Sequence, residues 1–105
     1  MSVEVADNPD LSRYEVRVDG ELAGFAQYRL RDGRITIFHA EVDPAYEGRG
    51  VGSQLASSAL ADVRARALEL VPRCPFIAGY VRRHPDLYLD LVAEPLREQV
   101  MAGGD

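Results

Sequence analysis

Apolar and polar residues alternate along three consecutive segments in the first half of the chain. In residues 13–18 every second residue is apolar and the others are charged, which is the pattern of a half-buried β-strand. Asp-Gly pairs at residues 19–20 and 32–33 separate this segment from residues 22–31 and 34–42, which read as two further strands. Asp-Gly pairs favour tight two-residue hairpin turns. The pattern therefore predicts an antiparallel meander of three strands.

The second half of the chain shows helical spacing. Residues 53 to about 66 carry apolar side chains on one face and polar side chains on the other, which predicts an amphipathic helix. The apolar residues 68–71 are predicted to form a strand parallel to residues 34–42, because a helical crossover joins the two. Pro75 suits the first position of a second helix, which must end before Pro85. The expected fold is α/β: meander, helix, parallel strand and short C-terminal helices.

The length and composition indicate one soluble domain. A chain of 105 residues can bury one modest core. Residues 1–12 are acidic and loop-like, so we expect them to lie loosely on a single compact domain formed by residues 13–100. The N-terminus has no signal pattern, and no segment approaches the roughly 20 apolar residues of a membrane span. We expect a cytoplasmic protein that is a monomer or weak dimer and does not act at a membrane.

Charge and cysteine content narrow the classes of function. The net charge is −5, which argues against nucleic-acid binding. Cys74 is the one cysteine, which excludes an internal disulfide and most cysteine-based metal sites. No metal site is predicted.

A glycine-rich stretch joins the third predicted strand to the first predicted helix. Gly48, Gly50 and Gly52 occupy alternate positions there. Without Cβ atoms the backbone N–H groups can approach a ligand closely, and a helix N-terminus attracts negative charge. These properties suit a phosphate or pyrophosphate. The spacing G-x-G-x-G differs from both common nucleotide-binding loops, and a tight turn without a ligand is the alternative interpretation.

The third predicted strand changes character along its length. By strict alternation, Ile35, Ile37, His39 and Glu41 share one face. The change from apolar to ionisable side chains near the glycine stretch predicts a core that opens into a cleft. In the alternative interpretation, His39 is a hydrogen-bonded histidine at the margin of the core.

Cys74 falls at or beside the N-cap of the helix predicted to begin at Pro75. The helix dipole and the neighbouring Arg73 both favour the thiolate form, and an approach of His39 would favour it further. The alternative is that Cys74 is a small buried apolar residue.

The glycine stretch resembles the acetyl-CoA pyrophosphate loop of the GCN5-related N-acetyltransferases, whose pattern is Gln/Arg-x-x-Gly-x-Gly/Ala. Residues 50–52 fit this pattern, and Asp43-Pro44-Ala45-Tyr46 matches the usual lead-in, but Glu47 stands where Gln or Arg is typical. Residues 14–92 resemble the compact branch of this superfamily, which has roughly 100 residues. Ala40 replaces the threonine that usually follows the histidine. Four segments carry the wider resemblance: Phe38-His39-Ala40-Glu41-Val42, Gly48-Arg49-Gly50-Val51-Gly52, Val71-Pro72-Arg73-Cys74-Pro75-Phe76 and Tyr80-Val81-Arg82-Arg83-His84-Pro85.

The resemblance implies acetyl-CoA as cosubstrate and assigns roles to particular positions. His39 and Cys74 align with the pair that faces the acetyl group. Tyr80 aligns with a tyrosine that protonates the departing CoA sulfur, although packing in the helix stripe is an equally good interpretation. The expected acetyl-CoA contacts are the backbone of Glu41 and Val42, the loop residues Gly48, Arg49, Gly50, Val51, Gly52 and Ser53, and a subset of the cations Arg49, Arg73, Arg82 and Arg83.

The implied reaction is acetyl transfer to an amine by direct attack within a ternary complex. His39 and Cys74 would then handle the proton and position the reactants; a transient acetyl-Cys74 is the other route. A short chain has few loops with which to enclose an acceptor, so an exposed amine of a peptide, protein or small polyamine is expected. A CoA-binding or protein-interaction module without turnover is the alternative class, which Glu47 and Ala40 favour mildly and the His39/Cys74 pair opposes.

Overall fold

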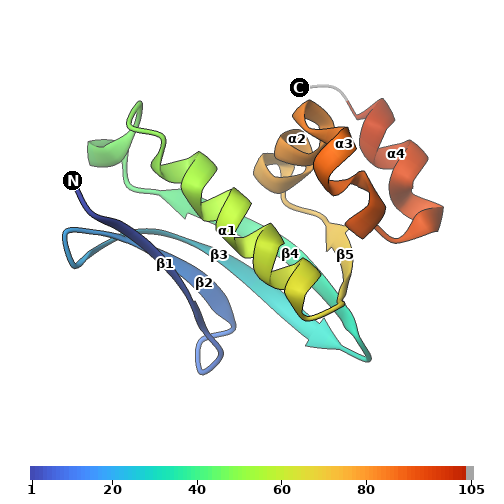
Figure 1. Cartoon of the computed structure of the whole chain (residues 1–105), viewed down its shortest axis with the longest axis horizontal. Helices are drawn as coiled ribbons and strands as arrows, with labels where there is room; N and C mark the ends of the chain where they lie inside the picture. The colour runs from blue at the N-terminus through green and yellow to red at the C-terminus, as the bar shows by residue number, and fades with distance from the viewer. Residues whose placement is uncertain (104–105) are drawn as a thin grey trace.

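The alternating segments and the Asp-Gly turns produce a mixed sheet in the computed structural model, which describes residues 1–103 (Figure 1). Within these residues the sheet has five strands in the order β1-β2-β3-β4-β5. The first four strands pair antiparallel, and β5 lies parallel to β4. The strands are β1 (Val3–Asn8), β2 (Arg13–Val18), β3 (Glu21–Arg31), β4 (Arg34–Val42) and β5 (Glu69–Pro72).

The helices lie in two groups. In Figure 1, α1 crosses one face of the sheet on its way from β4 to β5, and the later helices gather beside β5. A 3₁₀ turn at Pro44–Tyr46 precedes α1, and two more, Leu89–Leu91 and Glu94–Leu96, precede α4. The helices are α1 (Val51–Ala65), α2 (Pro75–Arg83), α3 (Pro85–Tyr88) and α4 (Arg97–Ala102).

The α/β fold predicted from the sequence is confirmed, including the strand parallel to β4 after the helix. Both Asp-Gly turns adopt positive φ at both residues, for example 50° at Asp19 and 85° at Gly20, as the predicted hairpin turns require. Helix α1 begins at Val51, two residues earlier than predicted, because Gly50 serves as its N-cap with φ of 75°. After the helix, Ala67 takes φ of 54°, a position where glycine is usual.

The prediction that residues 1–12 lie loosely on the surface is wrong. Val3–Asn8 forms β1, which pairs with β2 from Val3 opposite Val18 to Asn8 opposite Arg13. Val3 and Val5 pack against the core, so this segment has the alternation of a half-buried strand despite its acidic residues. The acidic residues of this segment led to the prediction of a loop in place of a strand.

Apolar side chains from the sheet and from α1 form the core, which extends to α2. Within the part of the chain that the structure describes, no buried side-chain nitrogen or oxygen lacks a hydrogen-bond partner, and no helix is long and apolar enough to cross a membrane. The largest fully buried side chains are Tyr14, Val16, Ile35, Ile37, Val51, Leu55, Leu60, Val63, Leu70, Ile77, Val81 and Val92.

Two tyrosine hydroxyls join the sheet to its surroundings. Tyr14 donates to Asp62 of α1 at 2.7 Å, and Tyr28 donates to Asp7 of β1 at 2.7 Å. Arg66 contacts both carboxylates at 3.3 Å. These contacts connect β1 to the C-terminal end of α1. The rings of Tyr14 and Tyr28 lie in the core, and their hydroxyls make the polar contacts.

Replacing Tyr28 with phenylalanine should lower the free energy of unfolding by about 1 kcal/mol at pH 7, because the Asp7 carboxylate loses a donor. Burial and the hydrogen bond to Asp7 raise the pKa of Tyr28 from 10.0 to about 12. Between these values the unfolded chain releases the phenol proton and the folded chain keeps it, so wild-type stability falls as the pH rises. The variant should lose less stability over that range. Urea unfolding of the wild type and the variant at pH 7 and pH 11 measures both effects. Equal free energies of unfolding for the two proteins at both pH values would contradict the role of this hydrogen bond.

Candidate active site

A β-bulge in β4 decides which side chains face the helices. Across from β3, Ile37 pairs with Tyr28 and His39 pairs with Gln27, so Phe38 is an additional residue. An extra residue reverses the alternation beyond it. The prediction that His39 and Glu41 share a face with Ile35 and Ile37 is therefore wrong.

Beyond the bulge the core-facing residues of β4 are Ala40 and Val42, which pack against the core. His39 and Glu41 lie on the opposite, open face of the sheet, with 49% and 61% of their side chains exposed. Their carboxylate and imidazole are 3.3 Å apart. The ring of His39 also lies 6.1 Å from that of Phe25 on the neighbouring strand.

One edge of β4 opens just before the glycine loop. The pairing of β4 with β5 ends at Ile37 and Pro72, where the Ile37 carbonyl accepts hydrogen bonds from the N–H groups of Arg73 and Cys74. On the other edge, the N–H of Asp43 donates to Ala23 of β3 at 2.7 Å. Successive residues of a strand direct their N–H and C=O groups to opposite edges.

Ala40 and Val42 therefore direct their backbone groups toward the side that β5 has left. Extended chains and ligands with amide groups pair with such an edge. Of the two residues predicted from the sequence to contact the cosubstrate, Val42 presents its backbone groups at the open edge, whereas Glu41 pairs with Phe25 of β3.

The glycine loop has a backbone that other residues adopt only with strain. Gly48 and Gly50 have φ of 78° and 75°, and a Cβ atom added to either would meet nothing within 4 Å. Gly50 makes no side-chain capping bond to the first turn of α1. No side chain therefore caps the backbone N–H groups of that turn, which is the arrangement that suits an anion.

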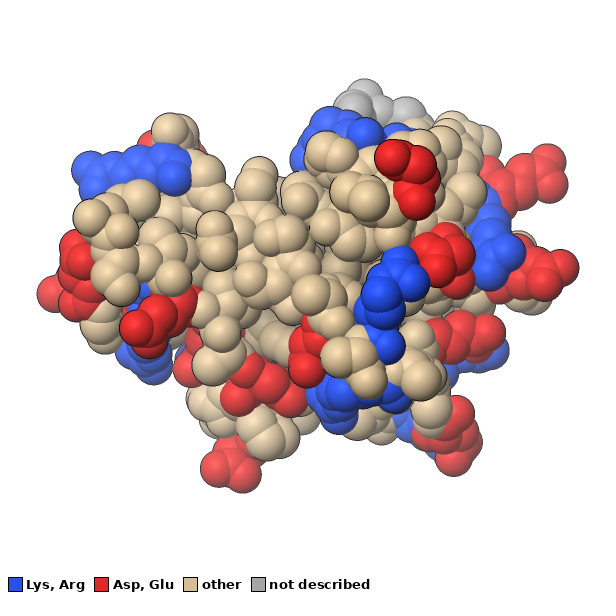
Figure 2. Space-filling view, viewed as in Figure 1, with Lys and Arg blue, Asp and Glu red and all other residues tan. Residues whose placement is uncertain are grey.

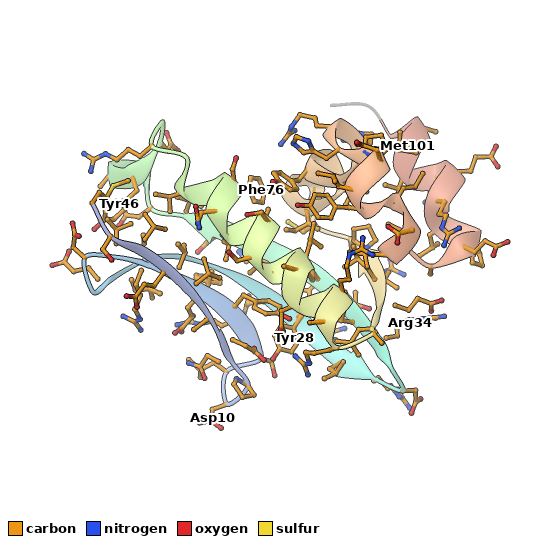
Figure 3. All side chains as sticks on the ribbon, viewed as in Figure 1. Asp10, Tyr28, Arg34, Tyr46, Phe76 and Met101 are labelled. Atoms are coloured by element: carbon orange, nitrogen blue, oxygen red, sulfur yellow. The ribbon has the colours of Figure 1, made fainter. Side chains whose placement is uncertain are left out.

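A hollow of about 280 Å³ lies over this loop, and Figure 2 shows the outline of the molecule notched between the lobe with the loop and the lobe with the later helices. Phe76 reaches from α2 toward the start of α1 (Figure 3), and a Cβ at Gly52 would lie 3.1 Å from its ring. The hollow is lined by Val42, Tyr46, Glu47, Gly48, Gly50, Val51, Gly52, Ser53 and Phe76.

The four arginines predicted as candidate contacts of acetyl-CoA lie in three different places. Arg49 lies in the loop with its guanidinium 5.9 Å from the ring centroid of Tyr46. Arg73 and Arg82 line another hollow, between β5, α2 and α4, and Arg82 donates to the carbonyl of Val100 at 3.1 Å. Arg83 lies 5.9 Å from the ring of Tyr80. Of these four arginines, only Arg49 belongs to the glycine loop itself.

Cys74 is the N-cap of α2, as the sequence predicts, and its residue is 3% exposed within the apolar core. Among the hydrogen bonds of the described residues, none joins its thiol to His39, which lies on the open face of the sheet. The fold therefore gives the two residues different surroundings, apolar for Cys74 and polar for His39.

Tyr80 follows Phe76 by four residues, so both side chains lie on one face of α2. Its ring centroid is 4.8 Å from that of His84 and 5.5 Å from that of Tyr88. Burial and the hydroxyl of Tyr80 raise the pKa of Tyr88. Phe76, His84 and Tyr88 were not predicted from the sequence as site residues. Together with Tyr80 these residues recur every four positions, which was the available signal, although Pro85 interrupts the helix between His84 and Tyr88.

Most of the chain matches one known family. Residues 13–91 match the family described as "GCN5-related N-acetyl-transferase". The chain belongs to this superfamily of acetyltransferase folds, as a compact member. No curated protein matches the sequence significantly.

Two solved structures are similar in fold. The Ard1 protein from Thermoplasma volcanium aligns with a TM-score of 0.50 and 25% identity over 59% of this chain and 42% of its own. The ribosomal-protein-alanine N-acetyltransferase from Brucella melitensis biovar Abortus 2308 aligns with a TM-score of 0.53 and 23% identity over 77% of this chain and 61% of its own. This chain thus spans less than two thirds of either protein.

Proposed function

We propose that this protein is an acetyl-CoA-dependent N-acetyltransferase. The observation that carries the proposal is the continuity of the open edge of β4 with the glycine-loop hollow, in a chain that belongs to the acetyltransferase superfamily. An extended thioester needs such a path, with anion-binding N–H groups at one end and strand-like backbone groups at the other.

In this proposal the N–H groups around Gly50 and Gly52 bind the pyrophosphate of CoA, with Arg49 beside them. The edge groups of Ala40 and Val42 pair with the amides of the pantetheine arm. A backbone N–H at this edge would polarise the thioester carbonyl and stabilise the negative charge that develops there. Glu47 also lines the hollow, so the side-chain contribution to anion binding is smaller than in loops with Gln or Arg.

The acetyl group passes directly to the amine. The amine nitrogen attacks the carbonyl carbon, a C–N bond forms, and the C–S bond breaks. The amine loses a proton to the imidazole of His39, and the departing CoA thiolate receives one from the hydroxyl of Tyr80. The burial of Cys74 supports direct attack, because a nucleophile must reach the carbonyl carbon from an accessible position.

Replacing Cys74 with serine should leave measurable activity. A serine hydroxyl is a much poorer nucleophile at neutral pH, so a covalent route would be almost abolished. For direct attack we expect a loss of no more than about tenfold, equivalent to about 1.4 kcal/mol of transition-state stabilisation. The Cys74→Ala variant is the control for the polarity of the new hydroxyl in the core. Inactivity of both variants, with folding and acetyl-CoA binding intact, would favour the covalent route.

The acceptor in this proposal is an exposed amine of a peptide, a protein or a small polyamine. One of the two similar structures is named as a ribosomal-protein-alanine N-acetyltransferase, which agrees with an acceptor on a polypeptide. Amine-dependent release of CoA thiol from acetyl-CoA tests the function. Binding of acetyl-CoA without such release from any amine would favour the alternative, a CoA-binding module, which the acidic Glu47 in the hollow mildly supports.

A further inference from the structure

Two hollows meet where β4 pairs with β5, on the side of the sheet away from the core. Thr36 of β4 pairs with Val71 of β5, while the residues on either side, such as Ile35 and Leu70, face the core. Thr36 lines a hollow of about 480 Å³, and Val71 lines a second hollow of about 330 Å³ that extends to α2 and α4. The two hollows therefore form one continuous surface.

The charge of this surface is opposite to that of the rest of the chain. Five of the twelve arginines line the two hollows, together with two of the seventeen acidic residues, Asp32 and Glu69. The local balance is +3, whereas the other seven arginines and fifteen acidic residues give −8. A hollow lined by one sign of charge concentrates counter-ions even on a protein of the opposite net charge. We call the five arginines the basic surface: Arg29, Arg31, Arg34, Arg73 and Arg82.

The fold restrains three of these guanidinium groups. Arg29 lies over the ring of Phe38, 4.9 Å from its centroid, which leaves N–H donors at the edge of the guanidinium. Arg82 donates to the carbonyl of Val100 at 3.1 Å. Arg34 pairs with Glu69 at 2.6 Å, so one carboxylate of the protein already binds here. Side chains that are already ordered lose less entropy when a ligand binds them.

The spacing and the walls of the hollows fit a polypeptide. Arg29 and Arg31 are alternate residues of β3, about 6.6 Å apart along the strand, and an extended peptide repeats its side chains at the same interval. Leu96 and Val100 give the second hollow an apolar wall, and Gln99 adds an amide. None of the described residues that line the two hollows is aromatic, so the bases of a nucleic acid would find no ring to stack on.

From these observations we infer that the basic surface docks an extended polypeptide segment with acidic residues at alternate positions. The carboxylates pair with Arg29, Arg31 and Arg73, and apolar side chains between them enter the hollow beside α4. Arg34 and Tyr46, which lines the glycine-loop hollow, lie toward opposite ends of the molecule (Figure 3). The docking surface is thus separate from the glycine loop, and the inference does not depend on acetyl transfer.

Binding of a fluorescein-labelled peptide of alternating Glu and Ser tests the surface by fluorescence anisotropy. At about 20 mM NaCl, Arg29→Gln and Arg73→Gln should each raise Kd about fivefold, which is the upper end for one exposed ion pair. Arg17→Gln is the matched control, because it makes the same change in net charge at an exposed arginine of β2. The control should stay within about 1.5-fold of the wild type, since Arg17 lies outside both hollows.

A variant with the opposite expected effect guards against damage to the fold. Glu69→Gln removes the carboxylate that competes for Arg34, so it should lower Kd about threefold. Glu4→Gln is its control, because Glu4 is an exposed carboxylate on β1 and the change in net charge is the same. Thermal unfolding of each protein checks that all of them are folded.

Three results would overturn the inference. The wild type could fail to bind the peptide at low salt. Arg17→Gln could weaken binding as much as Arg29→Gln and Arg73→Gln, which would indicate general attraction by net charge. An oligothymidylate with the same number of charges could bind more tightly than the peptide, which would make nucleic acid the occupant.

Discussion

Replacing Tyr80 with phenylalanine is expected to lower kcat about 100-fold, the loss typical of a missing general acid. In the proposed reaction the departing group is a CoA thiolate, and Tyr80 is the proposed proton donor because it lies on the same face of α2 as Phe76, which lines the glycine-loop hollow. Phenylalanine keeps the ring contacts with His84 and Tyr88 at 4.8 and 5.5 Å. Stability and acetyl-CoA binding should therefore change little.

The measurement is kcat at saturating acetyl-CoA with one fixed amine, together with thermal unfolding of each protein. Tyr88→Phe is the matched control, since it removes the neighbouring hydroxyl of the same aromatic cluster. We expect that control to lose less than tenfold. An unaltered kcat in Tyr80→Phe would assign Tyr80 to packing only.

The second large expected effect concerns the binding of acetyl-CoA to the glycine loop. At a concentration 100 times its Kd, acetyl-CoA should stabilise the wild type by about 2.7 kcal/mol. Gly50→Val should remove most of this gain, because the new side chain projects into the open space over the loop where the backbone must approach the ligand. Thermal unfolding with and without acetyl-CoA measures the loss.

The same substitution also strains the backbone, which a second variant controls for. Gly50 has φ of 75°, and a left-handed conformation costs a residue with a Cβ roughly 1–2 kcal/mol. Gly33 lies in the turn between β3 and β4 with φ of 77°, and a Cβ atom added there would also meet nothing within 4 Å. Gly33→Val should lose similar intrinsic stability and keep the full gain from acetyl-CoA. A full gain in folded Gly50→Val would show that the loop does not bind the cosubstrate.

The sequence predicted those parts of the fold that depend on neighbours along the chain. The limits of β2 and β4 follow from alternation bounded by Asp-Gly turns, and both turns have the positive φ values that this pair favours. The glycine-loop hollow was also predictable, because one continuous segment from Val42 to Ser53 supplies all of its lining except Phe76. Local sequence signals suffice for such a site.

The parts of the fold and of the site that were not predicted depend on pairing between segments that are distant in the sequence. In β4 the apolar positions change from odd numbers, Ile35 and Ile37, to even numbers from Phe38 onward, but strict alternation was assumed, and the extra residue becomes evident opposite Gln27 and Tyr28 of β3. It nevertheless decides the face on which His39 lies. The position of Arg82 depends in the same way on the packing of α4 against α2, where its guanidinium reaches the Val100 carbonyl. These features are set by tertiary contacts that one sequence does not reveal.

The proposed reaction is direct transfer of the acetyl group from acetyl-CoA to an amine. Mass spectrometry of both protein and amine, after incubation of the wild type with acetyl-CoA labelled in its acetyl group, tests it most directly. We predict one labelled amide on spermidine for each CoA thiol released, and no labelled protein when the amine is omitted. A stoichiometric labelled adduct on Cys74 that forms and discharges at the rate of turnover would contradict direct transfer, and the absence of any labelled amide would contradict acetyl transfer itself.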